Sequence, residues 1–252
     1  IKGTKKVHEV IKNISDIKSA TAQFLGEHFV LKKNPGKNSP SLITYQSPNV
    51  CLKDLEISLA GGFQASNAAL ALSACLHHAR KSGKEISEQS IRTSLKNTSW
   101  AGRMEVISSR PTILLDIAHN PAAVKEMAKS AQKLFSYTRV IVIYGAMKDK
   151  QSDEMLQELT NFADHFILVR PNQERSENPT RFKKILKKYN TPCEVIESIP
   201  KAIRKVKQTA LSDDMVCITG SIFTVGEAKH YLENESDFKT TISPSTGLHL
   251  NG

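Results

Sequence analysis

Several short segments combine residue types that can hold charged substrates. In DIAHNP, Asp116 and His119 stand at the junction between an apolar run and a helical pattern. A carboxylate at a strand end can accept two ribose hydroxyls. A histidine beside a helix N-terminus can join the backbone N–H groups in holding a carboxylate or phosphate. The alternative is a surface turn in which Asn120 and Pro121 simply start a helix.

Two further segments have the same mixed character. GAMKDK at 145–150 offers Lys148, Asp149 and Lys150, and a lysine here could neutralise an anionic substrate, although the loop could equally be only solvated. In ITGS, Gly220 allows close approach of the backbone, and the hydroxyl of Ser221 can donate a hydrogen bond. An ordinary strand-to-helix turn has the same composition.

Arg103 and Asn67 are the remaining candidates from the residues themselves. Arg103 lies in WAGRMEV and could reach nucleotide phosphates in a cleft between domains, or form an ion pair with Glu105. Asn67 could cap its helix or hydrogen-bond a base through its amide. The sequence identifies no catalytic residue.

Metal and nucleophile motifs are missing from the sequence. The pair His77-His78 cannot share one helix face, and the four cysteines form no close pair that suits zinc. GxSxG, HExxH and the phosphate loop GxxxxGK[ST] are all absent. We therefore expect no metal site within these residues and reduced cysteines.

The second half of the chain must position most of these residues. Near-continuous apolar runs alternate there with amphipathic segments, which predicts an α/β fold with an open, doubly wound, mostly parallel sheet. The expected strands are TILLD, RVIVIYG, HFILV, CEVIE and MVCITG, and the expected helices begin at 121, 151, 178 and 199. Asp116, Gly145, Arg170 and Thr219 end strands, so their loops should converge on one sheet edge.

The first half is less regular. VHEVIKNI reads as a short helix, and HFVLKK and SLITYQ read as strands around the turn-rich NPGKNSPS. SNAALALSACLHHARKSG predicts a helix with Ser66 as N-cap, and a second helix covers about 87–96. NTSWAGR breaks the pattern, so we place the domains at 1–100 and 101–235, followed by a flexible tail at 236–252.

Composition is that of a globular protein, with 39% hydrophobic and 24% charged residues among 252. No apolar run approaches the ~18 residues of a membrane span. The net charge of +10 suits an anionic small molecule as well as nucleic acid. Because the lysines are scattered and aromatic residues make up only 6%, we expect no nucleic-acid partner.

Taken in order, the motifs resemble the folylpolyglutamate synthase/dihydrofolate synthase family of the Mur ligase group. The resemblance covers most of residues 1–232 and rests on five collinear motifs: GGFQASNAALAL at 61–72, WAGRME at 100–105, DIAHNP at 116–121, GAMKDK at 145–150 and ITGSIFTVGEA at 218–228. It implies an ATP-dependent ligase that joins L-glutamate to folate, to dihydropteroate, or to both. An acyl phosphate is formed from ATP, and the amine of glutamate attacks it.

The resemblance also implies roles for individual residues. Asn67 is expected near the adenine, Arg103 near the phosphates and Asp116 at the ribose of ATP. His119 and Ser221 are expected to receive glutamate, and Asp149 and Lys150 match the family's loop acid and lysine, which we also assign to glutamate binding. Magnesium is implied as a cofactor.

The chain departs from the family pattern at several positions. Phe63 stands where the family has histidine, Ala101 replaces a proline, and Ile117 replaces a glycine. The family's phosphate loop and magnesium-binding residues precede the segment that IKGTKK resembles, so we expect residues 1–100 to be a truncated ATP-binding domain. These 252 residues alone are then expected to be inactive.

Three interpretations remain open at this stage. The first is a folate-pathway ligase, acting as a cytoplasmic monomer. The second is another Mur-type amino-acid ligase with a muramyl nucleotide substrate. The third is a non-catalytic remnant that binds nucleotide weakly. The sequence does not distinguish folate addition from dihydropteroate addition.

Overall fold

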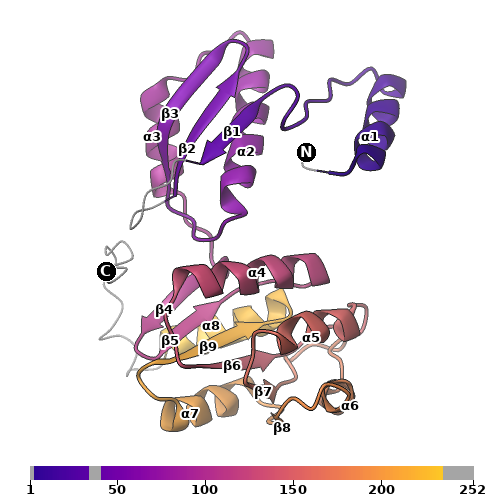
Figure 1. The fold of residues 1–252 in the computed structure, drawn as a ribbon, viewed down its shortest axis with the longest axis vertical. Coiled ribbons are helices and arrows are strands. Elements are labelled where there is room, and N and C mark those ends of the chain that lie inside the picture. Colours follow the sequence, from indigo (N-terminus) through magenta and orange to yellow (C-terminus); the bar gives the residue numbers. More distant parts are fainter. Residues whose placement is uncertain (1–2, 34–40, 235–252) are drawn as a thin grey trace. The chain divides into compact units, whose positions relative to one another are not determined.

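A computed structural model describes residues 3–33 and 41–234 (Figure 1). The chain separates into two compact units, one ending at Ser99 and the other beginning at Trp100. The turn-rich segment NPGKNSP and the predicted tail at 236–252 lie outside the described residues. No helix in the described ranges has the length and apolar character needed to cross a bilayer.

The first unit packs two helices against an antiparallel sheet. Its three strands lie in the order β1-β2-β3, and its core is formed by apolar side chains of the sheet, α2 and α3. The tight connection between β2 and β3 pairs Ser47 with Val50. Its elements are α1 (Lys5–Ile17), β1 (Val30–Lys33), β2 (Ser41–Ser47), β3 (Val50–Ile57), α2 (Gln64–Lys81) and α3 (Glu88–Asn97).

The first helix of this unit has an unusual surface. Val7, Val10, Ile14 and Ile17 recur at helical spacing, yet all four are exposed, and no residue of α1 is buried. Apolar residues at such spacing normally form the face that packs against a core. The described residues leave this face of α1 without a packing partner.

The second unit is the predicted α/β domain, and the mostly parallel sheet is confirmed. Its strand order is β4-β5-β9-β6-β7-β8; β4 runs antiparallel to β5 and the other pairs are parallel. Its strands are β4 (Glu105–Ser109), β5 (Thr112–Leu115), β6 (Arg139–Tyr144), β7 (His165–Leu168), β8 (Cys193–Val195) and β9 (Asp214–Thr219). Its helices are α4 (Pro121–Leu134), α5 (Ser152–Thr160), α6 (Pro179–Lys187), α7 (Ile199–Thr209) and α8 (Ile222–Asn234).

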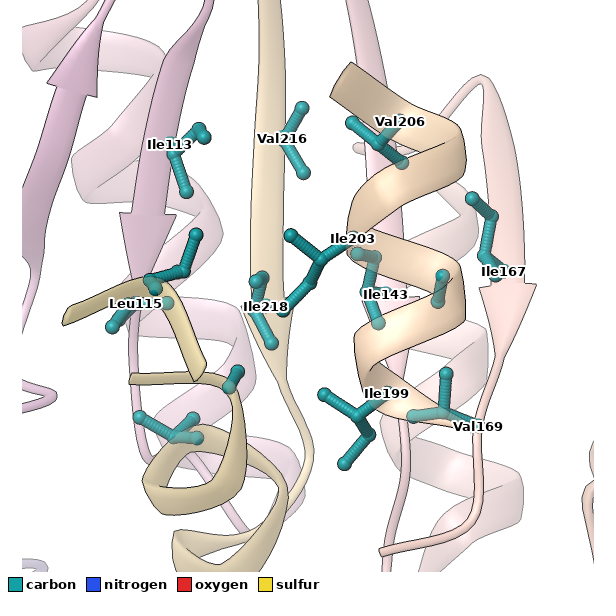
Figure 2. Close-up of a cluster of buried hydrophobic side chains, with 14 of the residues drawn as sticks. Ile113, Leu115, Ile143, Ile167, Val169, Ile199, Ile203, Val206, Val216 and Ile218 are labelled. Carbon is teal, nitrogen blue, oxygen red and sulfur yellow. The ribbon is translucent and has the colours of Figure 1, made fainter. Parts of the chain in front are cut away.

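Both faces of this sheet are buried, which explains the continuous apolar strands. Alternate residues of β9 face opposite ways: Cys217 contacts Met127 of α4, whereas Val216 and Ile218 join a cluster with α7 and α8. Helices α4 and α7 lie on opposite faces (Figure 1). Figure 2 shows the cluster on the α7 side, where Ile143, Ile203 and Ile218 pack together.

Three helices of the second unit begin in the way that their sequences predict. Asn120, Asn178 and Ser198 each cap a helix through a side-chain oxygen that accepts a backbone N–H, and a proline follows within the first two helical positions. These caps fix where each helix leaves the carboxyl edge of the sheet. The interpretation of Asn120-Pro121 as a helix start is therefore confirmed.

Several elements differ from prediction. Helix α2 begins at Gln64 with Phe63 as N-cap, so the prediction of Ser66 as the cap was wrong. Strands β3 and β4 and helix α8 were not predicted. Ile117, which replaces the family's glycine, has no left-handed backbone angle; its side chain is buried and joins the core cluster of the second unit.

Candidate functional site

Asp116 immediately follows β5, and its carboxylate is held by the backbone. The residue is 2% exposed. The N–H of Met104 donates to Oδ2 at 3.0 Å, and the N–H of Ala118 donates to Oδ1 at 2.9 Å. Burial raises the pKa of Asp116 to about 6, against the opposing effects of the two N–H groups and of nearby Arg103 and His119. The carboxylate of Asp116 thus connects the turn that contains Met104 to the segment that leads into α4.

Arg103 lies in the turn that Asp116 holds. The turn is tight, because Gly102 has a φ of +67° and a Cβ there would lie 2.7 Å from Cγ2 of Ile117. Arg103 is half-buried and close enough to Asp116 to oppose the rise of its pKa. The alternative ion pair with Glu105 is not formed. Glu105 instead binds Lys229 through one oxygen and accepts the N–H of Gly102 through the other.

His119 is exposed at the start of α4, with one ring nitrogen already used. Its Nδ1 lies 3.0 Å from the carbonyl oxygen of Ile117. A carbonyl can only accept, so Nδ1 carries the proton, and Nε2 is left for another partner. A neutral His119 can accept a proton or a hydrogen bond at Nε2, whereas a protonated one can donate to a carboxylate.

Ser221 lies after β9, where its side chain belongs to a hydroxyl chain. Its Oγ accepts the N–H of Thr224 at 3.0 Å and lies 2.9 Å from Oγ1 of Thr224. Thr224 in turn donates to the carbonyl oxygen of Gly145 at 2.7 Å. The hydroxyl proton of Ser221 therefore points to Thr224, and donation to a ligand would require that bond to break.

The segment after β6 is a charged loop. Lys150 and Asp149 form an ion pair of 2.9 Å, and Arg175 lies 3.9 Å from the same carboxylate. The hydrogen bond from Lys150 holds the pKa of Asp149 below its ordinary value. The N–H of Lys148 donates to the carbonyl of Arg175, which joins this loop to the segment after β7.

The sheet order brings these loops together. Because β9 lies between β5 and β6, the segments that contain Asp116, Ser221 and Gly145 are neighbours at one edge. The N–H of Asp116 donates to the carbonyl of Ile218, and that of Gly145 donates to the carbonyl of Thr219. The hydroxyl oxygen of Thr219 is buried and has no partner in the described ranges. The predicted convergence of the four strand ends on one edge is therefore confirmed, since the fourth, before Arg170, is that of β7, which pairs in parallel with β6.

Asn67 belongs to the other unit. It lies in the first turn of α2, is exposed, and donates from Nδ2 to Oε1 of Gln64 at 2.9 Å. This bond leaves its carbonyl oxygen for another donor. Its role at an adenine, like the roles of the residues above, stays a prediction.

Sequence reasoning missed Thr224, which joins Ser221 to Gly145. Its signal was present, since a hydroxyl residue three positions after a capping serine lies in the first helical turn beside the cap. The carbonyl that it binds lies 79 residues earlier, and no local pattern identifies that partner.

The described residues do not fit a metal site of their own. Across 3–33 and 41–234, no group of three or more His, Cys, Asp and Glu side chains could hold a metal ion.

Comparison with known proteins identifies the second unit. The family described as Mur ligase, glutamate ligase domain, matches residues 102–222. A probable bifunctional folylpolyglutamate synthase/dihydropteroate synthase of Haloferax volcanii is 33% identical over 177 residues, which are 70% of this chain and 20% of that protein. The dihydrofolate synthase/folylpolyglutamate synthase of Bacillus subtilis is 25% identical over 228 residues, which are 89% of this chain and 52% of that protein.

A solved structure has the same fold. The folylpolyglutamate synthase of Mycobacterium tuberculosis, in complex with ADP and AMPPCP, superposes with a TM-score of 0.81 at 22% identity. The superposition covers 91% of this chain and 53% of that one. At this identity the likeness concerns the fold alone. The chain spans between 20% and 52% of the length of the two relatives above.

Proposed function

The chain belongs to the folylpolyglutamate synthase/dihydrofolate synthase family of Mur ligases, and we propose that it forms part of an ATP-dependent ligase. This ligase adds L-glutamate to folate, to dihydropteroate, or to both. In this reaction a substrate carboxylate takes the γ-phosphoryl group of ATP and releases ADP. The amine of glutamate then attacks the acyl phosphate, forms the amide and displaces inorganic phosphate. The observation that carries the proposal is the shared edge of β5, β9 and β6, where Asp116, His119 and Ser221 follow adjacent strands.

For the nucleotide we propose the contacts that the family resemblance implies, and each is considered within its own unit. Asn67 has a free amide oxygen for an adenine amino group, and Arg103 is a half-buried cation suited to phosphate. Asp116 would accept ribose hydroxyls through the lone pairs that its two backbone bonds leave unused. The proposal is supported by the nucleotide complexes of the M. tuberculosis relative.

We assign glutamate to the loops after β5, β6 and β9. His119 presents Nε2 beside the N-terminus of α4, so a protonated ring and the helix amides would attract a carboxylate together. Lys150 and Asp149 add one charge of each sign, which suits an amino acid carrying an amine and carboxylates. Ser221 would contribute after releasing Thr224, or through its acceptor lone pair.

We also propose that the first unit is part of an ATP-binding domain. The exposed apolar face of α1 supports this, because such a face is stable when further protein surface covers it. The 252 residues contain no GxxxxGK[ST] phosphate loop, so we expect no turnover from them alone. Magnesium would be held by residues of that same domain outside the described ranges, and we expect the ligase to act as a cytoplasmic monomer.

The test is turnover by the gene's complete product with ATP, magnesium and L-glutamate, with folate and dihydropteroate offered in competition. An amide product from either substrate supports the proposal and decides between the two activities. Product from a muramyl nucleotide alone would assign the protein to another branch of the Mur ligases. Nucleotide binding with no product from any of these would favour the non-catalytic alternative.

Two variants separate the sites within the same assay. His119→Ala should raise the KM for glutamate and leave the KM for ATP unchanged. Arg103→Ala should lower kcat and raise the KM for ATP. If both variants change the same constant to the same degree, the division of the edge into nucleotide and glutamate contacts is wrong.

A further inference from the structure

The turn that carries Arg103 has a strained backbone. Gly102 and Met104, on either side of Arg103, both have positive φ angles, of 67° and 49°. A positive φ is unfavourable for a residue with a side chain, so Met104 keeps this conformation only because the surrounding contacts impose it. In the part of the chain that the structure describes, the guanidinium of Arg103 forms no hydrogen bond or ion pair. The backbone of the turn therefore sets its position.

Two carboxylates hold this turn, one on each side of Arg103. Asp116 accepts the N–H of Met104 at 3.0 Å. Glu105 accepts the N–H of Gly102 through Oε2 at 2.6 Å. Hydrogen bonds to a carboxylate are shorter and stronger than those between neutral groups. Glu105 thus stabilises the side of the turn that Asp116 does not bind.

Glu105 is itself fixed by a lysine of α8. Its other oxygen, Oε1, forms an ion pair with Lys229, whose ammonium also lies 3.1 Å from Oε1 of Glu233. The side chains of Glu105 and Lys229 are only 24% and 23% exposed, so water and salt screen this pair less than a fully exposed one. Lys229 and Glu105 thus connect α8, which begins directly after Ser221, to the backbone of Gly102.

We propose that Glu105 is a positioning residue: supported by Lys229, it holds Gly102 so that the guanidinium of Arg103 meets the nucleotide phosphates. This inference rests on the phosphate contact of Arg103 in the proposed function. Glu105 does not touch the nucleotide, because one N–H and one ammonium already occupy its carboxylate and its charge repels phosphate. A misplacement of about 1 Å in such a site can slow a reaction roughly a hundredfold.

The experiment is a double-mutant cycle in the gene's complete product, measured as kcat, the KM for ATP and the Kd for AMPPCP. Glu105→Ala should raise the KM and the Kd about tenfold, lower kcat, and leave the KM for glutamate unchanged. In a protein that already carries Arg103→Ala, the same substitution should change the KM and the Kd by less than about twofold, because its effect requires the guanidinium. The Kd can be measured even when no amide is formed, so a failure of the proposed reaction is told apart from a failure of the positioning role.

Conservative and control variants sharpen this result. Glu105→Gln keeps an oxygen for the N–H of Gly102 and should recover most of the loss. Lys229→Gln removes the support and should reproduce part of the defect of Glu105→Ala. Glu233→Gln removes a charge from the other partner of Lys229 and should leave all constants unchanged. If Glu105→Ala does not fold, Lys229→Gln replaces it in the cycle with Arg103→Ala.

Three results would overturn the proposal. The first is unchanged nucleotide binding in Glu105→Ala beside weakened binding in Arg103→Ala, which removes the positioning role and leaves the phosphate contact intact. The second is an equal effect of Glu105→Ala with and without Arg103, which makes Glu105 a general stabiliser of the fold. The third is unchanged nucleotide binding in Arg103→Ala, which refutes the phosphate contact and the positioning role together.

Discussion

The loops after β5 and β6 each carry an aspartate, and they hold it in opposite ways. Asp116 is buried, accepts two backbone N–H groups and has its pKa raised to about 6 by burial. Asp149 is exposed, pairs with Lys150, and has its pKa lowered by that hydrogen bond. The first carboxylate is fixed by the backbone and can meet a ligand only through the lone pairs that its two backbone bonds leave unused, whereas the second can exchange its partner for a ligand.

This difference separates two kinds of contribution to a binding site. Asp116 fixes the turn of Arg103 relative to the start of α4, so its effect on any ligand passes partly through those neighbours. Asp149 and Lys150 have few constraints, so they can reorient at small energetic cost. The predictions below test whether the rigid and the adaptable loop differ in this way.

The largest effect on stability is expected at Gly220, which packs against Gly145 at the start of the loop after β6. Its φ is +108°, and a Cβ would lie 2.5 Å from the carbonyl oxygen of Gly145. Gly220→Ala therefore combines backbone strain with a clash against backbone, and should lower the free energy of unfolding by about 4 kcal/mol. Urea denaturation measures this.

Gly226→Ala is the matched control in the same unit. Gly226 lies within α8, and a Cβ there would meet nothing within 4 Å. This substitution should raise the free energy of unfolding by about 0.5–1 kcal/mol, because alanine favours helix. Equal destabilisation by both variants would mean that the edge does not require the conformation of Gly220.

The second prediction concerns Asp116 and pH. A folded pKa of about 6 lies above the ordinary 3.8, so the folded state binds the proton more tightly. The stabilising contribution of Asp116 is then fully present below about pH 4 and is lost as pH rises through about 6. The free energy of unfolding of the wild type, minus that of Asp116→Asn, should fall by about 3 kcal/mol across this window.

Chemical denaturation of both proteins from pH 3.5 to pH 7.5 provides the measurement. The comparison is made between the two proteins, so that titrations common to both cancel. A difference that stays constant with pH would show that Asp116 titrates normally. In that case, the contrast with Asp149 is lost.

The third prediction concerns the hydroxyl chain from Ser221 to Gly145. Thr224→Val keeps the shape of the side chain but leaves the buried carbonyl of Gly145 without its donor, which should cost about 2 kcal/mol. Thr224→Ser keeps the hydroxyl and should restore most of that loss. If valine and serine are equally stable, the chain contributes packing and no hydrogen bond.

The parallel part of the fold could be predicted from the sequence because each strand there is buried on both faces. After Arg139, the residues VIVIY of β6 form an uninterrupted apolar run, and all of them are buried. Strand β4 gave no such signal, because it pairs on one side only, is half exposed, and has an irregular register between Val106 and Ser108. Helix α8 was missed because apolar residues lie around much of it and Gly226 interrupts it.

The candidate site could be predicted only in part, because local patterns show where strands end but not which distant residues contact one another. Strand ends mark which loops share an edge, so the neighbourhood of Asp116 and Ser221 followed from the alternation of elements. The hydrogen-bond partners did not follow from that alternation. The N–H of Met104 donates to Asp116 from a residue twelve positions earlier, and the hydroxyl of Thr224 donates to Gly145, which lies 79 positions earlier. The place of β9 between β5 and β6 is likewise a property of the whole packing.

The smallest effect is expected at Asp149, and its sign is opposite to that at Asp116. The folded pKa of Asp149 lies below 3.8, so its contribution to stability is present above that pH and is lost as pH falls below it. The wild type should therefore be slightly more stable than Asp149→Asn near pH 6, with the difference vanishing towards pH 2.5 and in high salt, because both charges are exposed. Denaturation curves in low and high salt measure this difference. A large, salt-independent effect would show that the loop after β6 is as fixed as the loop after β5, and that both aspartates belong to the architecture.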